Sequence, residues 1–194
     1  RDPERLDSAG FAFYTCAGVE PWRGAPVDAF ATSDHAPFGA VASAAMYRRS
    51  ALEAVGLFHP EYFCYYEDTD IAVRLVLWGH PTVYVPEAVA HHVGSRTGKT
   101  QSDFWVYHLR RNVEYLFWVD MVGHLAWINL PFHLLYEGLA LVAASRRGQL
   151  RVVLDAKADA FAHRAWVKDA RRALRADLVK QGRLRTAQAD LRRA

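Results

Sequence analysis

The order of apolar and polar positions divides the chain into an irregular first part and a helical remainder. Residues 1–37 contain four prolines and three glycines, so no regular period runs through them, and only residues 10–15 fit a short strand. Residues 38–48 are mostly small and apolar. Within them, residues 41–47 fit either a buried strand or a buried helical turn, which periodicity does not separate.

Two helices are predicted in the middle of the chain because residues typical of helix ends flank them. Residues 51–56 follow Ser50 as a predicted N-cap, with Glu53 at the third helical position and a glycine at the end. A second helix is predicted over residues 70–78, where apolar residues recur at helical spacing and Gly79 supplies a left-handed C-terminal residue.

The residues after Gly79 read as two extended pieces and a loop. Residues 82–85 form a predicted strand that Pro86 ends, and residues 88–93 form another. Residues 94–99 have a glycine near each end and the composition of a loop.

The second half of the chain is predicted to be helical over residues 103–118, 127–144 and most of 150–193, with breaks or kinks at Gly123 and Pro131. It contains no run of about 18 uncharged apolar residues, so the sequence does not predict a conventional membrane span.

Composition favours a folded protein and reveals a charge asymmetry. The 194 residues are 52% hydrophobic and 13% aromatic, enough for one domain with or without an appendage. Residues 145–194 hold 11 Arg and 3 Lys against 5 Asp, a balance of +9, while residues 1–144 carry −6. Two cysteines, Cys16 and Cys64, provide no disulfide framework and fit a reducing compartment.

The most specific polar feature is a carboxylate cluster, Glu67, Asp68 and Asp70, followed later by the pair His91-His92. A carboxylate at the rim of a pocket can take a proton from a hydroxyl nucleophile. An imidazole is a common ligand of divalent metals. The spacing therefore suits a general base beside a metal ligand.

Both features also have structural interpretations. Asp68 and Asp70 suit the first turn of the following helix, where carboxylates accept backbone N–H bonds and favour the positive end of the helix dipole. A histidine pair at a strand end is commonly a hydrogen-bonded structural feature. From the residues alone, these alternatives stay open.

A longer pattern around the cluster resembles the family 2 glycosyltransferases, the inverting GT-A enzymes that include bacterial rhamnosyltransferases and mycobacterial galactofuranosyltransferases. The resemblance covers roughly residues 5–130 and is specific for the superfamily rather than for the sugar. The matching pattern comprises a small-residue run ending in Tyr47-Arg48-Arg49, the segments 51–58 and 63–70, Arg74, Gly79, Tyr84-Val85-Pro86 and His91-His92.

The resemblance implies an α/β fold, the C-terminal half of a GT-A (nucleotide-diphospho-sugar transferase) fold. Residues 1–100 would form the acceptor-side half that carries the catalytic base, and residues 101–194 a mainly helical, basic C-terminal region. It places the base on Asp68, which would deprotonate an acceptor hydroxyl that attacks a nucleotide sugar with inversion, and a supporting role on Glu67.

The resemblance also suggests roles for further residues. Asp70 and Arg74, at positions i and i+4, would form a structural pair. His92 would help bind Mg²⁺ or Mn²⁺ at the donor diphosphate, and Arg96 lies in a loop that would close over the diphosphate unless it is an ordinary solvated loop. Tyr66 and Trp78 would offer aromatic surface to the substrate, although aromatic residues are usually core.

The chain departs from the family in lacking the upstream nucleotide-binding half with its Asp-x-Asp. It also starts without an initiator Met or a signal peptide. We therefore expect a C-terminal portion of a longer enzyme, inactive when isolated because most of the donor site is missing. His59 and Ser43 are smaller departures that would affect an acceptor pocket.

The aromatic segment 104–144 and the basic tail have two equally weighted interpretations. In the first, they would dock on the anionic cytoplasmic leaflet of the cell membrane. This agrees with the glycolipid or cell-envelope polysaccharide acceptors that the resemblance implies. In the second, they would form a helical subdomain that packs on the catalytic part. An inactive glycosyltransferase-like scaffold is the functional alternative. Nucleic-acid binding is not expected, since no recognised nucleic-acid fold accompanies the basic tail, and the sequence does not indicate the oligomeric state.

Overall fold

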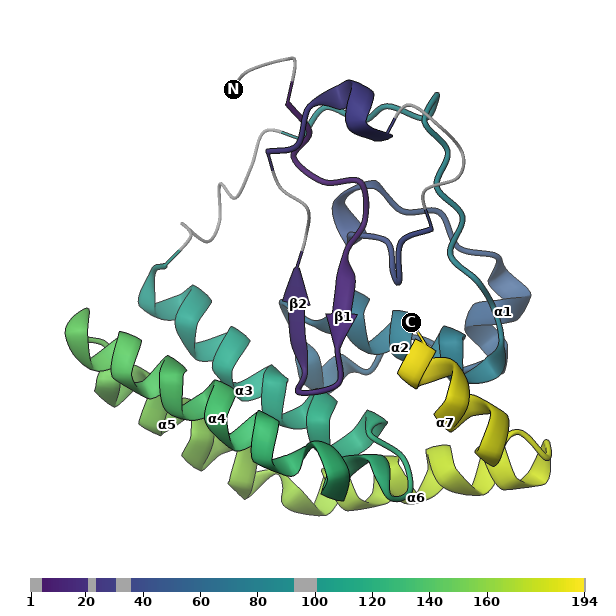
Figure 1. The fold of residues 1–194 in the computed structure, drawn as a ribbon. Helices are drawn as coiled ribbons and strands as arrows, with labels where there is room; N and C mark the ends of the chain where they lie inside the picture. Colours follow the sequence, from purple (N-terminus) through teal and green to yellow (C-terminus); the bar gives the residue numbers. More distant parts are fainter. Residues whose placement is uncertain (1–4, 21–23, 31–35, 93–100, 194) are drawn as a thin grey trace.

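The computed structural model describes residues 5–20, 24–30, 36–92 and 101–193, which form a helical layer beneath an irregular upper part (Figure 1). α3 is central in this layer and packs against α2, α5 and α6, while α2 also packs against α7. The helices of the layer are α2 (Glu67–Trp78), α3 (Asp103–Asp120), α4 (Leu125–Arg146), α5 (Leu150–Ala162), α6 (Arg164–Lys180) and α7 (Leu184–Arg193).

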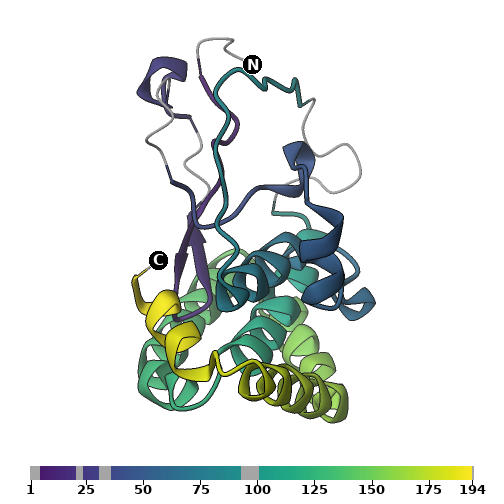
Figure 2. The same cartoon turned by 90° about the vertical axis from the view of Figure 1, so that its right-hand side faces the viewer.

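The upper part contains short elements joined by loops, and Figure 2 shows them above the helices from a second side. A two-stranded antiparallel hairpin extends down to the helical layer, where Thr15 at its turn donates a hydrogen bond to Asn129 of α4 (2.6 Å). The elements are β1 (Ala12–Tyr14), β2 (Gly18–Glu20), the 3₁₀ turns η1 (Val27–Phe30), η2 (Ala42–Ala44) and η3 (Pro60–Tyr62), and the short helix α1 (Arg49–Ala54).

One hydrophobic core joins both parts of the chain. Phe11, Phe13 and Phe38 from the upper part pack into the same cluster as apolar residues of α2, α3, α6 and α7. Phe13 and Phe38 stack with ring centroids 4.8 Å apart. Residues 1–100 and 101–194 therefore share a core in the described structure, and the helical region supports the segment that carries the carboxylate cluster.

The helix predictions are confirmed in outline and corrected at their starts. Gly79 ends α2 with φ +78° as predicted. However, α2 begins at Glu67, three residues before the predicted start, so Asp68 and Asp70 lie inside its first turn. Acidic residues are favourable there because the helix dipole is positive at that end.

The prediction that Ser50 caps the first short helix is wrong. α1 begins at Arg49, its N-cap is Arg48, and no side chain caps it. Ser50 lies within the first turn instead. Starting the helix at Arg49 allows its side chain to pair with Glu53 (2.7 Å), an i,i+4 interaction that supports a helix.

The strand predictions after α2 are also wrong for the described residues. Residues 82–85 and 88–92 adopt no strand, because a strand needs a neighbour for its hydrogen bonds and none is placed beside them here. Residues 41–47 form neither a buried strand nor a buried helix but include the exposed turn η2. The described part is thus mainly helical with one small sheet, and residues 101–193 form the mainly helical region that was predicted.

The second half matches its predicted helices, with Gly123 at the break between α3 and α4. Residues 150–193 form three helices, and α4 continues through Pro131. The expectation of no membrane-span-like segment needs correction, because α4 is long and apolar enough to cross a membrane by length and composition. One such helix is weak evidence for a span, since core helices of soluble proteins pass the same test.

Candidate active site at the start of the second helix

The loop that leads into α2 has an unusual backbone. Phe63, Tyr65 and Tyr66 have φ angles of 58°, 65° and 69°, in the left-handed region that residues other than glycine rarely adopt. Each such conformation costs about 1–3 kcal/mol and persists only when its surroundings impose it. The loop therefore requires support from elsewhere in the fold to place the first residues of α2.

Asn112 of α3 provides that support. Its side chain is fully buried and donates to the carbonyl oxygens of Tyr62 (2.8 Å), Cys64 (2.9 Å) and Tyr65 (2.7 Å). Arg111 adds hydrogen bonds to two carbonyl oxygens at the start of the same loop. The sequence alone predicts no role for either residue; the available signal is a polar pair inside an aromatic helical segment.

Asp68 lies in the first turn of α2 and is half-buried. Its Oδ2 accepts from the backbone N–H of Ala42 (3.1 Å), and its Oδ1 accepts from the Thr69 hydroxyl (3.3 Å). Burial raises the pKa of Asp68, against the opposing effect of the Ala42 N–H. A carboxylate offers about four lone-pair sites, so this side chain retains capacity to accept a further proton donor.

Glu67 and Tyr47 lie beside Asp68, and in the described part of the chain each has a polar atom without a hydrogen-bond partner. Glu67 Oε2 and the Tyr47 hydroxyl are buried, and neither has a hydrogen-bond partner among the described residues. Burial, followed by the charges of Asp68 and Glu67, raises the pKa of Tyr47 to about 12. Burial and the Asp68 charge likewise raise the pKa of Glu67. The sequence alone predicts no role for Tyr47 at this site, since no local pattern indicates that it lies beside α2.

Asp70 and Arg74 form the structural pair expected from their spacing. Both are buried, the guanidinium of Arg74 donates to Asp70, and it also donates to the carbonyl oxygen of Val55 (2.5 Å). His59 Nδ1 lies 3.3 Å from the other oxygen of Asp70. Burial alone would raise the pKa of Asp70, but the His59 hydrogen bond and the Arg74 charge lower it.

Asp120, at the end of α3, is a further buried carboxyl beside this pair. Burial, with the Asp70 charge, raises the pKa of Asp120 well above its usual range. Its neutral form is therefore favoured, which avoids a second negative charge next to Asp70.

The structure places His92 away from the described contacts of the carboxylates. His92 Nδ1 lies 2.7 Å from Asp7 Oδ2, and both side chains are partly exposed. The strand expected to aim His92 does not form. Within residues 5–20, 24–30, 36–92 and 101–193, no three His, Cys, Asp or Glu side chains gather in a way that would hold a metal ion. The described residues alone therefore do not fit a complete metal site.

The three residues predicted to touch substrate differ in their placement. Tyr66 is buried and its hydroxyl donates to the carbonyl oxygen of Ala17 (3.1 Å). Trp78 is buried in the same core. Both have the surroundings of packing residues. Arg96 lies outside the described residues, and its role stays a prediction.

The arrangement brings together a half-buried base, a second carboxylate and an unpartnered hydroxyl at the start of one helix. A carboxylate whose pKa is raised is a stronger base than an exposed one. The site can thus accept a proton from a neutral hydroxyl group that enters beside Asp68. Asn112 and Arg111 hold the loop that positions it.

Comparison with known proteins identifies related sequences. The model of the family described as "Glycosyl transferase family group 2" matches residues 13–165. Two curated proteins, both named N-acetylglucosaminyl-diphospho-decaprenol L-rhamnosyltransferase, come from the CDC 1551 and H37Rv strains of Mycobacterium tuberculosis. Each is 35% identical over 122 residues, which cover 57% of this chain and 38% of the relative. No solved structure matches significantly.

Proposed function

The chain belongs to glycosyl transferase family group 2, and from this premise we propose that it carries the acceptor-activating part of a sugar-transferring enzyme. The observation that carries the proposal is the environment of Asp68. Its carboxylate is half-buried, its pKa is raised, and it accepts a hydrogen bond from the backbone N–H of Ala42. It retains lone pairs that can accept a further hydrogen bond. Beside it lie buried polar atoms of Glu67 and Tyr47 that have no hydrogen-bond partner among the described residues.

The proposed reaction is a single displacement with inversion. Asp68 accepts the proton of an acceptor hydroxyl, and that oxygen attacks the anomeric carbon of a nucleotide sugar. The bond between the anomeric carbon and the diphosphate oxygen breaks, and its electron pair leaves with the nucleoside diphosphate. Glu67 orients the acceptor, and the Asn112-supported loop keeps Asp68 in position.

The names of the relatives support an acceptor class. Those proteins are named for transfer of L-rhamnosyl to N-acetylglucosaminyl-diphospho-decaprenol, a lipid-linked saccharide. We propose that this chain likewise serves a glycolipid or a cell-envelope polysaccharide, at the cytoplasmic face of the cell membrane. The identity of the transferred sugar does not follow from the site.

The chain spans 38% of the length of the relatives it matches, and the only Asp-x-Asp in its sequence is the Asp68-Thr69-Asp70 of the base motif. We therefore propose that donor binding needs residues beyond this chain, and that the 194-residue chain by itself does not transfer sugar. Measurable transfer by the isolated chain would contradict this part of the proposal.

The role of Mg²⁺ or Mn²⁺ stays a prediction, and no step above passes through a metal. His92 and Asp7 are the described side chains that would contribute ligands, together with groups outside the described residues. The test is calorimetric titration of Mn²⁺ into the enzyme that contains the upstream residues. His92→Ala should weaken binding, whereas His80→Ala should leave it unchanged; equal affinity in both variants would remove His92 from the site.

The main test replaces Asp68 by Asn in the enzyme that contains the upstream residues. A positioned general base contributes about 10²–10⁴-fold to rate, so transfer should fall by that range while the circular dichroism spectrum and unfolding midpoint stay close to those of the parent. Asp169→Asn, on an exposed carboxylate of α6, is the matched control and should keep full transfer. An Asp68→Asn enzyme with undiminished transfer would favour the scaffold alternative.

A further inference from the structure

The fourth helix has its polar and apolar faces reversed relative to a helix that faces water. Asn129, His133 and Glu137 recur every four residues along α4, and their side chains bond to the rest of the protein. Asn129 accepts from Thr15 (2.6 Å), and His133 bonds to the carbonyl oxygen of Cys16 (2.9 Å). These contacts make the polar stripe of α4 its inward face.

The inward stripe is held by charged groups of the neighbouring helices. His133 Nε2 lies 3.3 Å from Glu114 of α3. Glu137 pairs with Arg110 of α3 (3.3 Å) and with Lys157 of α5. The side of α4 that faces the protein is therefore fixed in an ionic network.

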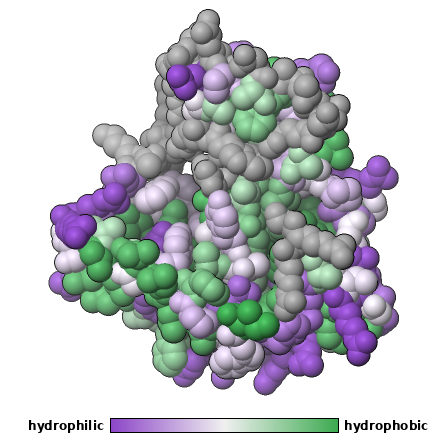
Figure 3. All heavy atoms as spheres, in the orientation of Figure 1, coloured by the Kyte–Doolittle hydropathy of each residue, from purple (hydrophilic) through white to green (hydrophobic). Residues whose placement is uncertain are grey.

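The outward stripe consists of large apolar side chains. In Figure 3, hydrophobic residues gather over α4 at the lower left of the face shown. A contiguous exposed stripe of this kind marks an interaction surface rather than ordinary protein surface. We name it the α4 apolar face; its members, each at least half exposed, are Trp127, Ile128, Phe132, Leu134, Leu135, Leu139 and Val142.

A cationic groove adjoins the N-terminal end of the α4 apolar face. It encloses about 1060 Å³ between α3, α4, α5 and α6, with Trp118 and Trp127 among its walls. Its basic side chains include Lys157, which is paired, and four others for which the described residues show no carboxylate partner: Arg164, Lys168, Arg171 and Arg175.

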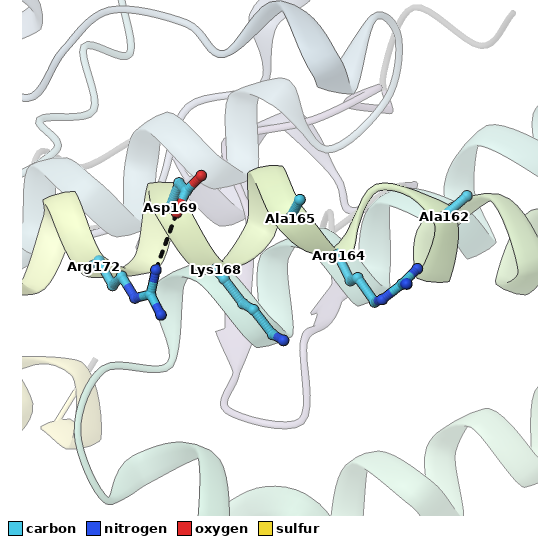
Figure 4. A pocket seen from close by; sticks show the side chains of 6 residues that line it. All are labelled: Ala162, Arg164, Ala165, Lys168, Asp169 and Arg172. Atoms are coloured by element: carbon cyan, nitrogen blue, oxygen red, sulfur yellow. Dashed lines mark hydrogen bonds and ion pairs between the residues drawn. The ribbon is translucent and has the colours of Figure 1, made fainter.

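Two of the basic side chains on α6 extend to the same side of the helix. Figure 4 shows Arg164 and Lys168 extending to the same side of α6, while Asp169 extends to the other side and pairs with Arg172 (3.3 Å). Burial and the nearby Arg175 lower the pKa of Arg171, as expected where like charges crowd. At the opposite end of α4, Arg146 and Arg147 are exposed. Positive charge thus borders the apolar face at both ends.

We propose that the α4 apolar face and the cationic groove dock on an anionic lipid bilayer, with α4 lying in the plane of the interface. Apolar side chains would enter the boundary of the acyl region, and lipid phosphates would bind the groove and the Arg146-Arg147 end. Inward polar groups and outward apolar groups are the arrangement expected of a helix beside lipid, and Trp127 suits the interface.

An in-plane position follows from the ionic network. With 22 residues, α4 is about 33 Å long, comparable to a bilayer core. Crossing the bilayer would draw Glu114, Arg110 and Lys157 into hydrocarbon, which is costly for charged groups. Lying flat exposes only the apolar face to lipid.

The charges also favour a bilayer over a second copy of the chain. Antiparallel pairing of two α4 apolar faces would bring the cationic groove of one copy to the Arg146-Arg147 end of the other. Parallel pairing would bring groove to groove. Both arrangements place like charges together, which disfavours association, whereas an anionic headgroup layer complements both ends at once.

The proposal concerns a surface separate from Asp68 and holds whether or not sugar transfer occurs. Its test is sedimentation of the full 194-residue chain with phosphatidylcholine vesicles, with and without phosphatidylglycerol. The unmodified chain should bind the phosphatidylglycerol vesicles more tightly, and less tightly as salt rises. Asp68→Asn should bind like the unmodified chain, so that a failure of the catalytic proposal is distinguishable from a failure of this one.

Two pairs of substitutions make the test specific. Phe132→Gln with Leu139→Gln removes two apolar side chains that are 62% and 61% exposed. Vesicle binding should fall at least about tenfold, because burying one such side chain accounts for that much. The control, Val83→Gln with Val89→Gln, changes two exposed valines away from α4 and should leave binding unchanged. Because all four positions are exposed, these variants should fold.

The cationic groove is tested by Arg164→Gln with Lys168→Gln. This variant should lose most of the preference for phosphatidylglycerol, whereas Lys180→Gln at the far end of α6 should keep it. Absence of vesicle binding by the unmodified chain overturns the proposal. Equal losses in the valine control also overturn it, as does concentration-dependent self-association that the Phe132 and Leu139 substitutions abolish while vesicle binding persists.

Discussion

Two groups of ionisable side chains in the helical layer have opposite electrostatic character. At the start of α2, burial raises the pKa values of Asp68 and Glu67, and Glu67 Oε2 has no hydrogen-bond partner among the described residues. Between α3, α4 and α5, Glu114 is half-buried. Its hydrogen bonds to His133 and Lys157 nevertheless outweigh that burial and lower its pKa to about 2.

The difference separates structural charges from candidate catalytic ones. Lys157 lies 2.6 Å from Glu114 and His133 lies 3.3 Å from it, so this carboxylate is satisfied within the protein. Asp68 and Glu67 are desolvated without an equivalent cationic partner, which leaves them available to an incoming hydroxyl. Carboxylates that cost stability in the folded state are characteristic of functional sites.

The largest effect on stability is expected from Arg74→Met. Asp70 lies two residues from Asp68, but like Glu114 it is a carboxylate paired with a cation inside the protein. The substitution leaves Asp70 buried without its guanidinium partner, which should cost about 3–5 kcal/mol of unfolding free energy in urea denaturation. Arg172→Met, on an exposed arginine, should change stability by less than about 0.5 kcal/mol. Similar results for the two variants would contradict a structural role for the pair.

Asn112→Ala tests whether α3 positions the loop before Asp68. The carbonyl oxygens of Cys64 and Tyr65 lose their donor, while that of Tyr62 keeps Arg111. The substitution should cost about 2–3 kcal/mol, and transfer by the enzyme with its upstream residues should fall with it. Asn129→Ala, on α4, should cost about 1 kcal/mol and leave transfer unchanged. If Asn112→Ala lost stability but kept full transfer, the loop would not position the base.

The pH dependence of stability should reveal the Glu114 cluster. Because the folded pKa of about 2 lies below the unfolded value of 4.5, Glu114 stabilises the fold fully above about pH 4.5, and this contribution is lost as the pH falls towards 2. Unfolding free energies measured between pH 6 and 3 should decline less steeply in Glu114→Gln than in the unmodified chain. Equal slopes would contradict the lowered pKa.

Glu67→Gln should produce the smallest change, with the opposite sign. The folded pKa of Glu67 is raised, so its contribution is present at low pH and is lost as the pH rises through that pKa, leaving the ionised group destabilising at pH 7. The variant should therefore unfold at a slightly higher temperature than the parent at pH 7, and transfer should decrease less than in Asp68→Asn. A lower unfolding temperature would indicate that Glu67 stabilises the fold, as the paired carboxylate of Glu114 does.

Most features that depend on residues close together in the sequence were predicted correctly, whereas most features that depend on distant residues were not. α3 and α4 were recognisable from apolar periodicity, and the end of α2 from Gly79, because these signals lie within a few residues of each other. The strands at residues 82–85 and 88–92 failed because strand formation depends on a neighbour that no local pattern specifies. α2 begins three residues before its predicted start because the aromatic loop that leads into it adopts positive φ angles that bulky residues rarely take.

The sequence is sufficient to predict the helices of the second half, the Asp70–Arg74 pair, the family and the location of the carboxylate cluster at the start of a helix. These depend on neighbours three or four residues apart, or on a linear order of motifs. The tertiary structure alone decided that Ala42 holds Asp68, that Tyr47 adjoins Glu67, and that Asn112 supports the loop between them. It alone also decided that α4 turns its polar stripe inward. These features join segments that are tens of residues apart, so they arise only when packing fixes which face of each element meets another.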